Sequence, residues 1–151
     1  RLFGFDPKVA FVSHSTFGQP LTSRTKHIKN AVEILKDKNV NFEFDGDMQP
    51  DVALDEEYKS LYPFSKIVGN ANILIMPGQH SAAISYKMMK TLGDTKVIGP
   101  LLIGLGLPIE IAPLRSSTSE IINLASIAAY SAAIIDYKKT NPFEFSNLQP
   151  K

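Results

Sequence analysis

Ala71-Asn-Ile-Leu-Ile-Met76 is the clearest strand pattern in this chain. It is almost continuously apolar, and Pro77-Gly78 ends it. A strand of a parallel sheet that is covered on both faces has this composition, because neither face needs polar side chains. We therefore predict a buried strand in the core of a parallel sheet at residues 71–76.

Strand and helix patterns alternate on both sides of this stretch. Apolar or alternating runs predict further strands at residues 8–13, 40–44, 96–102 and 108–111. Helical spacing of apolar residues predicts helices at residues 21–37, 51–61, 81–92 and 119–138. Residues 45–47, Asp-Gly-Asp, have the composition of a turn. The alternation predicts an α/β fold, with a doubly wound, mostly parallel sheet between two layers of helices.

Composition excludes several classes of function. The 151 residues carry a net charge of +1, so no strong field favours nucleic acid or an anionic membrane. The absence of cysteine excludes disulfides, thiolate catalysis and cysteine-ligated zinc. No run of about 18 apolar residues occurs, so we expect no membrane-spanning helix. The absence of cysteine fits a reducing compartment, and we expect a cytoplasmic protein. The chain starts at Arg1 rather than Met, which suggests a segment of a longer polypeptide.

The first candidate site precedes the last predicted helix, at Arg115-Ser-Ser-Thr-Ser-Glu120. Unpaired amides at a helix start, together with hydroxyls and an arginine, suit a phosphate group. Ser117 and Glu120 have the spacing of a capping box. The alternative is an ordinary helix cap beside a surface arginine.

The second candidate is the loop that follows the first predicted strand, Ser13-His-Ser-Thr-Phe-Gly18. Its hydroxyls and glycine are able to surround an anion, and His14 is able to transfer a proton. The alternative is a turn of small polar residues. Lys87, on the helix predicted at 81–92, is either a phosphate contact or a solvated lysine.

Metal and nucleotide motifs are incomplete. Asp45, Asp47 and Glu56 occupy calcium-loop positions one, three and twelve, but Pro50 replaces the glycine that the sharp turn needs. Gly104-Leu-Gly106 begins like a dinucleotide motif, but Ile109 stands at its third glycine position. We therefore predict no metal site and no dinucleotide site.

Seven strings of the sequence, in their order and spacing, resemble the later part of a phosphotransacetylase. They are Lys8-Val-Ala-Phe-Val-Ser-His-Ser15, Phe44-Asp-Gly-Asp-Met-Gln49, Leu61-Tyr-Pro-Phe-Ser-Lys66, Ala71-Asn-Ile-Leu-Ile-Met-Pro77, Ser85-Tyr-Lys87, Ile98-Gly-Pro-Leu-Leu-Ile-Gly104 and Ser116-Ser-Thr-Ser-Glu-Ile-Ile-Asn123. The Asp-Gly-Asp-Met-Gln and Leu-Tyr-Pro-Phe-Ser strings are most similar to the domain fused to the C-terminus of bacterial NADP-dependent malic enzymes.

The resemblance implies a three-layer fold like that of isocitrate and isopropylmalate dehydrogenases, in two lobes. Residues 1–139 match the second lobe and the helix that returns to the first, and residues 140–151 are expected to form a flexible tail. In the malic enzymes, upstream domains decarboxylate malate oxidatively to pyruvate with NADP and a divalent metal, Mg or Mn. The phosphotransacetylase-like part regulates them in response to acetyl-CoA and helps to assemble a homodimer or higher homo-oligomer.

Two departures from the family pattern concern catalysis. Phosphotransacetylases carry Ser-Arg-Gly before the last helix and an aspartate in its first turn, which are thought to bind CoA and help deprotonate its thiol. Here Leu114 replaces the serine, Arg115 matches the arginine and Glu120 replaces the aspartate. The longer glutamate displaces the carboxylate, which weakens base catalysis.

The resemblance therefore implies a regulatory domain that binds an acyl-CoA-type ligand and needs no cofactor of its own. The residues expected at the ligand are Ser13, Ser15, Thr16, Lys87, Arg115, Ser116, Ser117, Thr118 and Glu120. Two alternatives remain: an active phosphate acetyltransferase, and a purely structural dimerisation module built on the alanine-rich last helix.

Overall fold

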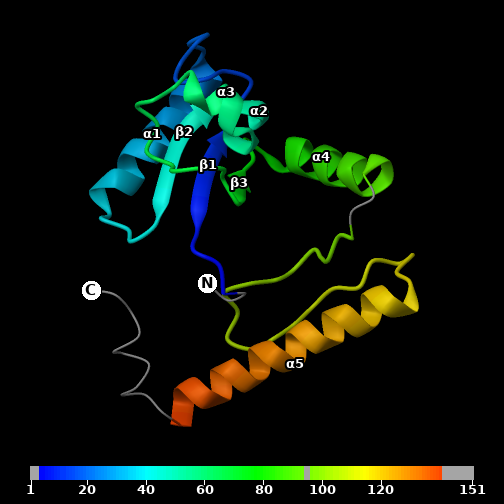
Figure 1. Cartoon of the computed structure of the whole chain (residues 1–151). Helices are drawn as coiled ribbons and strands as arrows, with labels where there is room; N and C mark the ends of the chain where they lie inside the picture. The colour runs from blue at the N-terminus through cyan, green and yellow to red at the C-terminus, as the bar shows by residue number, and fades with distance from the viewer. Residues whose placement is uncertain (1–3, 94–95, 141–151) are drawn as a thin grey trace. The chain divides into compact units, whose positions relative to one another are not determined.

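The computed structural model describes residues 4–93 and 96–140, with the side chain of Lys138 excepted. The chain divides into two compact units, Arg1–Met88 (unit 1) and Met89–Lys151 (unit 2), and each is described by itself. Figure 1 labels the helices and strands in chain order.

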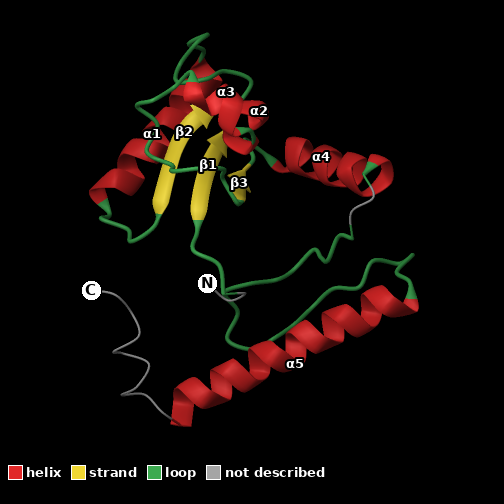
Figure 2. Ribbon diagram, in the orientation of Figure 1, coloured by secondary structure: helices red, strands yellow, loops and turns green. Residues whose placement is uncertain are grey.

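Unit 1 contains a three-stranded parallel sheet (Figure 2). Its strands are β1 (Lys8–Val12), β2 (Glu43–Met48) and β3 (Ile73–Ile75), in the order β2-β1-β3. The parallel sheet among helices confirms the predicted α/β class.

The described residues of the two units also form five helices. They are α1 (Ser23–Asp37), α2 (Pro50–Leu54), α3 (Glu56–Ser60), α4 (Gln79–Leu92) and α5 (Thr118–Thr140). Thr22 caps α1, because its hydroxyl accepts the amide of Thr25. Helix α1 packs against β2, and α2 packs against β1 and α3. The helices predicted at 21–37, 81–92 and 119–138 are thus confirmed to within about two residues.

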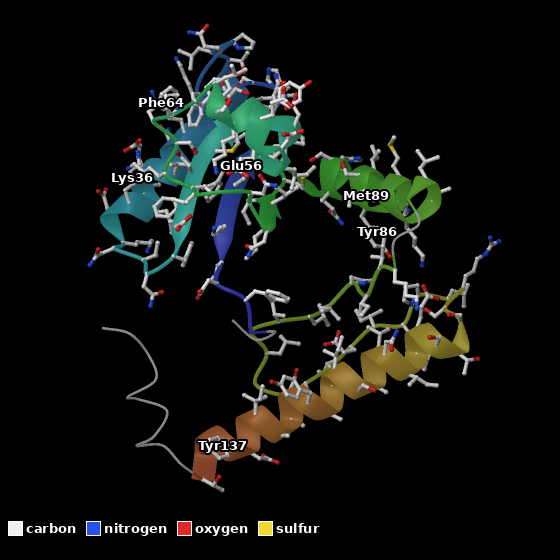
Figure 3. The ribbon with its side chains drawn as sticks, viewed as in Figure 1. Lys36, Glu56, Phe64, Tyr86, Met89 and Tyr137 are labelled. Atoms are coloured by element: carbon white, nitrogen blue, oxygen red, sulfur yellow. The ribbon has the colours of Figure 1, made fainter. Side chains whose placement is uncertain are left out.

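The core of unit 1 lies between the sheet and the segment from α2 to β3. Its buried members are Ala10, Met48, Val52, Ala53, Ile67 and Ala71. Phe17 and Tyr62 pack at its edge, and the ring of Phe64, labelled in Figure 3, lies 4.8 Å from that of Phe17. Small side chains such as Ala10 and Ala53 allow α2 to approach the central strand closely.

The stretch at residues 71–76 contains a strand, which is shorter than predicted, and its predicted burial is wrong. The strand is β3, an edge strand of the described sheet, since only β1 pairs with it. Ile73 is 40% and Ile75 is 43% exposed. Continuous apolarity indicates a strand but does not show how many neighbours cover it.

The turn predicted at residues 45–47 is also wrong, because these residues lie within β2. The strand begins at Glu43 rather than at residue 40. Phe11 pairs with Gly46 and Val12 with Met48, so Asp47 is the extra residue of a bulge. The sequence favours a turn because buried aspartates are unusual in strands, and here their carboxylates have specific partners.

The helix predicted at 51–61 is two helices, α2 and α3. Asp55 separates them in an extended conformation, and its carboxylate caps α3 by accepting the amide of Glu57 at 2.8 Å. The strands predicted at 96–102 and 108–111 are absent from the described residues of unit 2. Gly99 has φ of 128°, which an extended strand does not use, and prolines 100 and 108 remove amide donors from both runs.

Helix α5 is the main element of unit 2. Over Thr118–Tyr137 it is long enough to cross a membrane, and its mean hydropathy of 1.3 is also in the range of membrane-spanning helices. The sequence, by contrast, predicts no helix of this kind. Isoleucine and alanine raise the hydropathy, and only Glu120 and Asp136 are charged in that span. The indication is weak, because core helices of soluble proteins meet the same criteria. Residues 141–151, the remainder of the predicted tail, lie outside the described residues.

Candidate functional site

A capping box fixes the N-terminus of α5, as the spacing of Ser117 and Glu120 predicts. The Ser117 amide donates to Glu120 Oε2 at 2.7 Å, and the Glu120 amide donates to Ser117 Oγ at 3.3 Å. Two amides of the first turn are therefore satisfied within the protein. Ser117 and Glu120 thus have a structural role that does not require a ligand.

Lys90, near the end of α4, forms an ion pair with Glu120 at 2.6 Å. This hydrogen bond, followed by those from the amide and hydroxyl of Ser117, lowers the pKa of the Glu120 carboxyl to about 2. The group is consequently a carboxylate at neutral pH, and its charge is balanced by the ammonium of Lys90. A carboxylate with such a low pKa is a weak base.

The space beside this helix start is small. A cavity of about 10 Å³ lies among Gly99, Pro113, Ser116 and Glu120, which is room for about one water molecule. Arg115 and Thr118 are exposed, and a turn bond from the Ser116 amide to Pro113 O at 2.9 Å holds the segment before the helix. The site therefore presents an arginine and hydroxyls at a surface, rather than a deep pocket.

In the loop after β1, the three residues that the sequence predicted as ligand contacts are buried. Ser15 is fully buried, and its hydroxyl donates to Asp47 Oδ2. Thr16 Oγ1 accepts the amide of Gln49 at 3.2 Å. The Ser13 hydroxyl accepts the amide of Ser15 at 3.3 Å. These hydroxyls hold the loop together, which limits their capacity to bind a ligand.

Asp47 and Asp45, which the sequence offered only as positions of an incomplete calcium loop, have a structural role that it did not predict. Asp47 is 1% exposed, and its Oδ1 accepts the amide of Gly18 at 3.0 Å. Asp45 Oδ2 accepts the amide of Lys66 at 2.7 Å. Each carboxylate ties a loop to β2 by a charge-assisted bond. Their buried, hydrogen-bonded state explains why Asp-Gly-Asp stands in a strand.

Eight of the nine expected ligand residues fall into two groups, one in each unit. In unit 2, the group at the start of α5 consists of Arg115, Ser116, Ser117, Thr118 and Glu120, and Lys90 pairs with Glu120. In unit 1, the three hydroxyls of the loop after β1 lie together. Lys87 is an exposed residue of α4. Among the described residues, no three histidine, aspartate or glutamate side chains form a cluster that could hold a metal ion.

The geometry defines an α/β domain whose last helix begins at a capping box beside an exposed arginine. The chain belongs to the family described as phosphate acetyl/butaryl transferase, which matches residues 1–129. Domains of this kind occur in NADP-dependent malic enzymes and in phosphate acetyltransferases.

Relatives of both kinds are similar in sequence. An NADP-dependent malic enzyme of Rhizobium meliloti is 47% identical over 132 residues, which cover 87% of this chain and 17% of that protein. A phosphate acetyltransferase of Clostridium acetobutylicum is 35% identical over 133 residues, which cover 87% of this chain and 40% of that protein. The chain thus spans a small part of the malic enzyme and less than half of the acetyltransferase.

Solved phosphotransacetylases have the same fold. The EutD phosphotransacetylase from Staphylococcus aureus superposes with a TM-score of 0.78 at 30% identity, over 87% of this chain and 41% of its own. A phosphotransacetylase from Streptococcus pyogenes gives a TM-score of 0.79 at 34% identity, over 87% and 40% of the two chains. These comparisons confirm the fold that the resemblance implied.

Proposed function

We propose that this chain is the phosphotransacetylase-like domain of a malic enzyme and acts there as a regulatory domain that binds an acyl-CoA-type ligand. The strong similarity to malic enzymes supports the assignment of the parent protein. The upstream domains of that parent are proposed to decarboxylate malate oxidatively with NADP and Mg²⁺ or Mn²⁺, in a cytoplasmic homo-oligomer.

The observation that favours binding over acyl transfer is the state of Glu120. This residue stands where the resemblance places the catalytic aspartate of phosphotransacetylases. Its carboxylate is held by Lys90 and Ser117, and its pKa of about 2 leaves it little tendency to take a proton from a thiol. Leu114 supplies no hydroxyl at the neighbouring position. The site thus retains anion-binding groups without a competent base.

Arg115 and Ser116 are the proposed phosphate contacts. Arg115 is exposed, and its planar guanidinium is able to hold two phosphate oxygens. The helix start adds a favourable partial positive charge. Because Glu120 is paired with Lys90, its charge opposes an incoming phosphate less than a free carboxylate would.

Calorimetric titration of acetyl-CoA into the intact malic enzyme chain tests this proposal. We expect saturable binding, which Arg115→Ala weakens about tenfold or more because a charge-assisted contact is lost. Lys26→Ala, which removes an exposed lysine of α1, is the matched control and leaves binding unchanged. Binding that is absent, or equally weakened by both substitutions, contradicts the proposal.

An active phosphate acetyltransferase is the second candidate, favoured by the 35% identity to the Clostridium acetobutylicum enzyme. It predicts acetyl phosphate formation from acetyl-CoA and phosphate. A purely structural dimerisation role is the third, favoured by the exposed apolar side chains of α5, such as Ile122 and Tyr130. It predicts a dimer, by light scattering, whose state acetyl-CoA leaves unchanged.

A further inference from the structure

A groove of about 290 Å³ lies within unit 1 beside β2, an edge strand of the described sheet. Helix α1 contributes Lys29, Glu33 and Lys36, which follow one another on one face of the helix. The other lining residues are Phe17, Asp45, Gly46, Asp47, Phe64 and Lys66. None of the residues expected at the acyl-CoA-type ligand lines this groove.

Two phenyl rings give the groove an apolar surface. The rings of Phe17 and Phe64 lie 4.8 Å apart in an edge-to-face arrangement, and the ring of Tyr62 lies 5.5 Å from that of Phe17. Phe64, labelled in Figure 3, is nevertheless 65% exposed. A ligand that covers this ring gains hydrophobic contact that the described part of the protein does not supply.

The three carboxylates of the groove already have partners. Asp47 accepts the amide of Gly18, and Asp45 accepts the amide of Lys66. Glu33 forms an ion pair with Lys36 at 2.6 Å. These carboxylates are therefore satisfied within the protein and do not require a cationic ligand.

Lys29 and Lys66 are the cations that remain. Both are exposed, and neither forms an ion pair with a described side chain. The hydrogen bond from Lys36 is the main cause that lowers the pKa of the Glu33 carboxyl, and the charges of Lys66 and Lys29 lower it further. The two ammonium groups, which come from different segments, thus act on the same wall of the groove. The charge that remains for an occupant is positive.

The groove differs from a phosphate site. Its lining contains no arginine and no helix N-terminus, since Lys29 stands in the second turn of α1. Its volume is near the lower limit for pockets of small organic ligands. We propose that this groove binds a small aromatic carboxylate, with the carboxylate at Lys29 and Lys66 and the ring against Phe17 and Phe64.

The test is a titration of phenylacetate into the full 151-residue chain, followed by amide NMR signals. We expect saturable shifts at Phe17, Gly46 and Lys66. The ligand 2-phenylethanol keeps the ring without the charge, and acetate keeps the charge without the ring, so each is expected to bind at least threefold more weakly. Equal binding of phenylacetate and 2-phenylethanol, or the absence of saturable shifts at these residues, would overturn the proposal.

Two substitutions of exposed side chains, which should leave the fold intact, test the contacts. Lys29→Gln is expected to weaken phenylacetate binding about threefold, and Phe64→Ala about tenfold. Lys26→Gln, on the same helix, and Phe5→Ala are the matched controls outside the groove and should leave binding unchanged. Equal weakening by each variant and its control would show diffuse attraction and overturn the proposal. Arg115→Ala is expected to leave phenylacetate binding intact, so that failure here is separate from failure of the acyl-CoA proposal.

Discussion

Units 1 and 2 use their apolar side chains in different ways. Among the described residues, every buried hydrophobic side chain except Leu124 belongs to unit 1. In unit 2, Ile103 is 79% and Leu107 is 68% exposed, and Leu114 is fully exposed. Unit 1 is therefore held by a packed core, whereas local hydrogen bonds and the Lys90–Glu120 ion pair define the start of α5. The same kind of substitution should consequently lower the free energy of unfolding more in unit 1 than in unit 2.

Replacement of a glycine by alanine should show the largest difference. At Gly46, with φ of 150°, an added Cβ would lie 2.7 Å from both Cβ and O of Phe11, so Gly46→Ala is expected to cost about 3 kcal/mol or more. At Gly106, apart from its neighbours in the chain, no atom lies within 4 Å of the position that an added Cβ would take. Gly106→Ala should therefore change the free energy of unfolding by less than about 1 kcal/mol. Urea unfolding measures both, and equal midpoints would contradict the comparison.

Removal of a buried carboxylate is the next effect in size. Asp47→Ala leaves the buried Ser15 hydroxyl and the Gly18 amide without their acceptor, so we expect a loss of about 3 kcal/mol. Asp37→Ala, at the exposed end of α1, is the control and should change stability by less than about 0.5 kcal/mol. Thermal unfolding followed by circular dichroism distinguishes them. A small effect at Asp47 would mean that the loop after β1 does not depend on it.

Truncation of an apolar side chain compares packing directly. Met48 is fully buried in the core of unit 1, and Met48→Ala is expected to cost about 2–3 kcal/mol. Ile122 on α5 is 58% exposed, and Ile122→Ala should cost less than about 1 kcal/mol. If urea unfolding shows that Ile122→Ala lowers the free energy of unfolding as much as Met48→Ala, Ile122 is packed more closely than its exposed fraction indicates.

The smallest expected effect is the pH dependence of the α5 start. The pKa of Glu120 is lowered to about 2, so its stabilising contribution is present above the ordinary carboxyl pKa of 4.5 and is lost as pH falls toward about 2. NMR titration of the Glu120 carboxyl should show the low pKa. Lys90→Met should move the pKa back toward its ordinary value, since Lys90 is the largest cause of the shift. An unchanged pKa in that variant would show that the ion pair does not form.

Much of the fold follows from local patterns, and the exceptions have physical causes. The apolar run of β1 and the helical spacing of α1, α4 and α5 predict these elements correctly. The sequence predicts a strand at 40–44 but ends it too early, because Asp45 and Asp47 are suited to a strand only once loops distant in sequence supply their hydrogen-bond donors. It also places strands at 96–102 and 108–111, since apolar composition alone does not show whether a neighbouring strand is present.

For the candidate site too, the sequence predicted the local contacts but not those between distant segments. The spacing of Ser117 and Glu120 predicts the capping box within one helical turn. Lys90 lies 30 residues from Glu120, so local spacing gives no sign of their ion pair. The groove at Phe17, Lys29 and Lys66 likewise brings together three separate segments. Contacts between distant segments require the fold, and they decide the chemistry of both sites.

The domain is proposed to bind acyl-CoA without transferring its acyl group. The most direct measurement is the formation of acetyl phosphate from acetyl-CoA and inorganic phosphate by the intact malic enzyme chain, under conditions where calorimetry shows acetyl-CoA bound. We predict binding with no acetyl phosphate above the rate without protein, because Glu120 is a weak base and Leu114 lacks a hydroxyl. Acetyl phosphate formed faster than without protein, and lost in Arg115→Ala, would instead establish an active acetyltransferase.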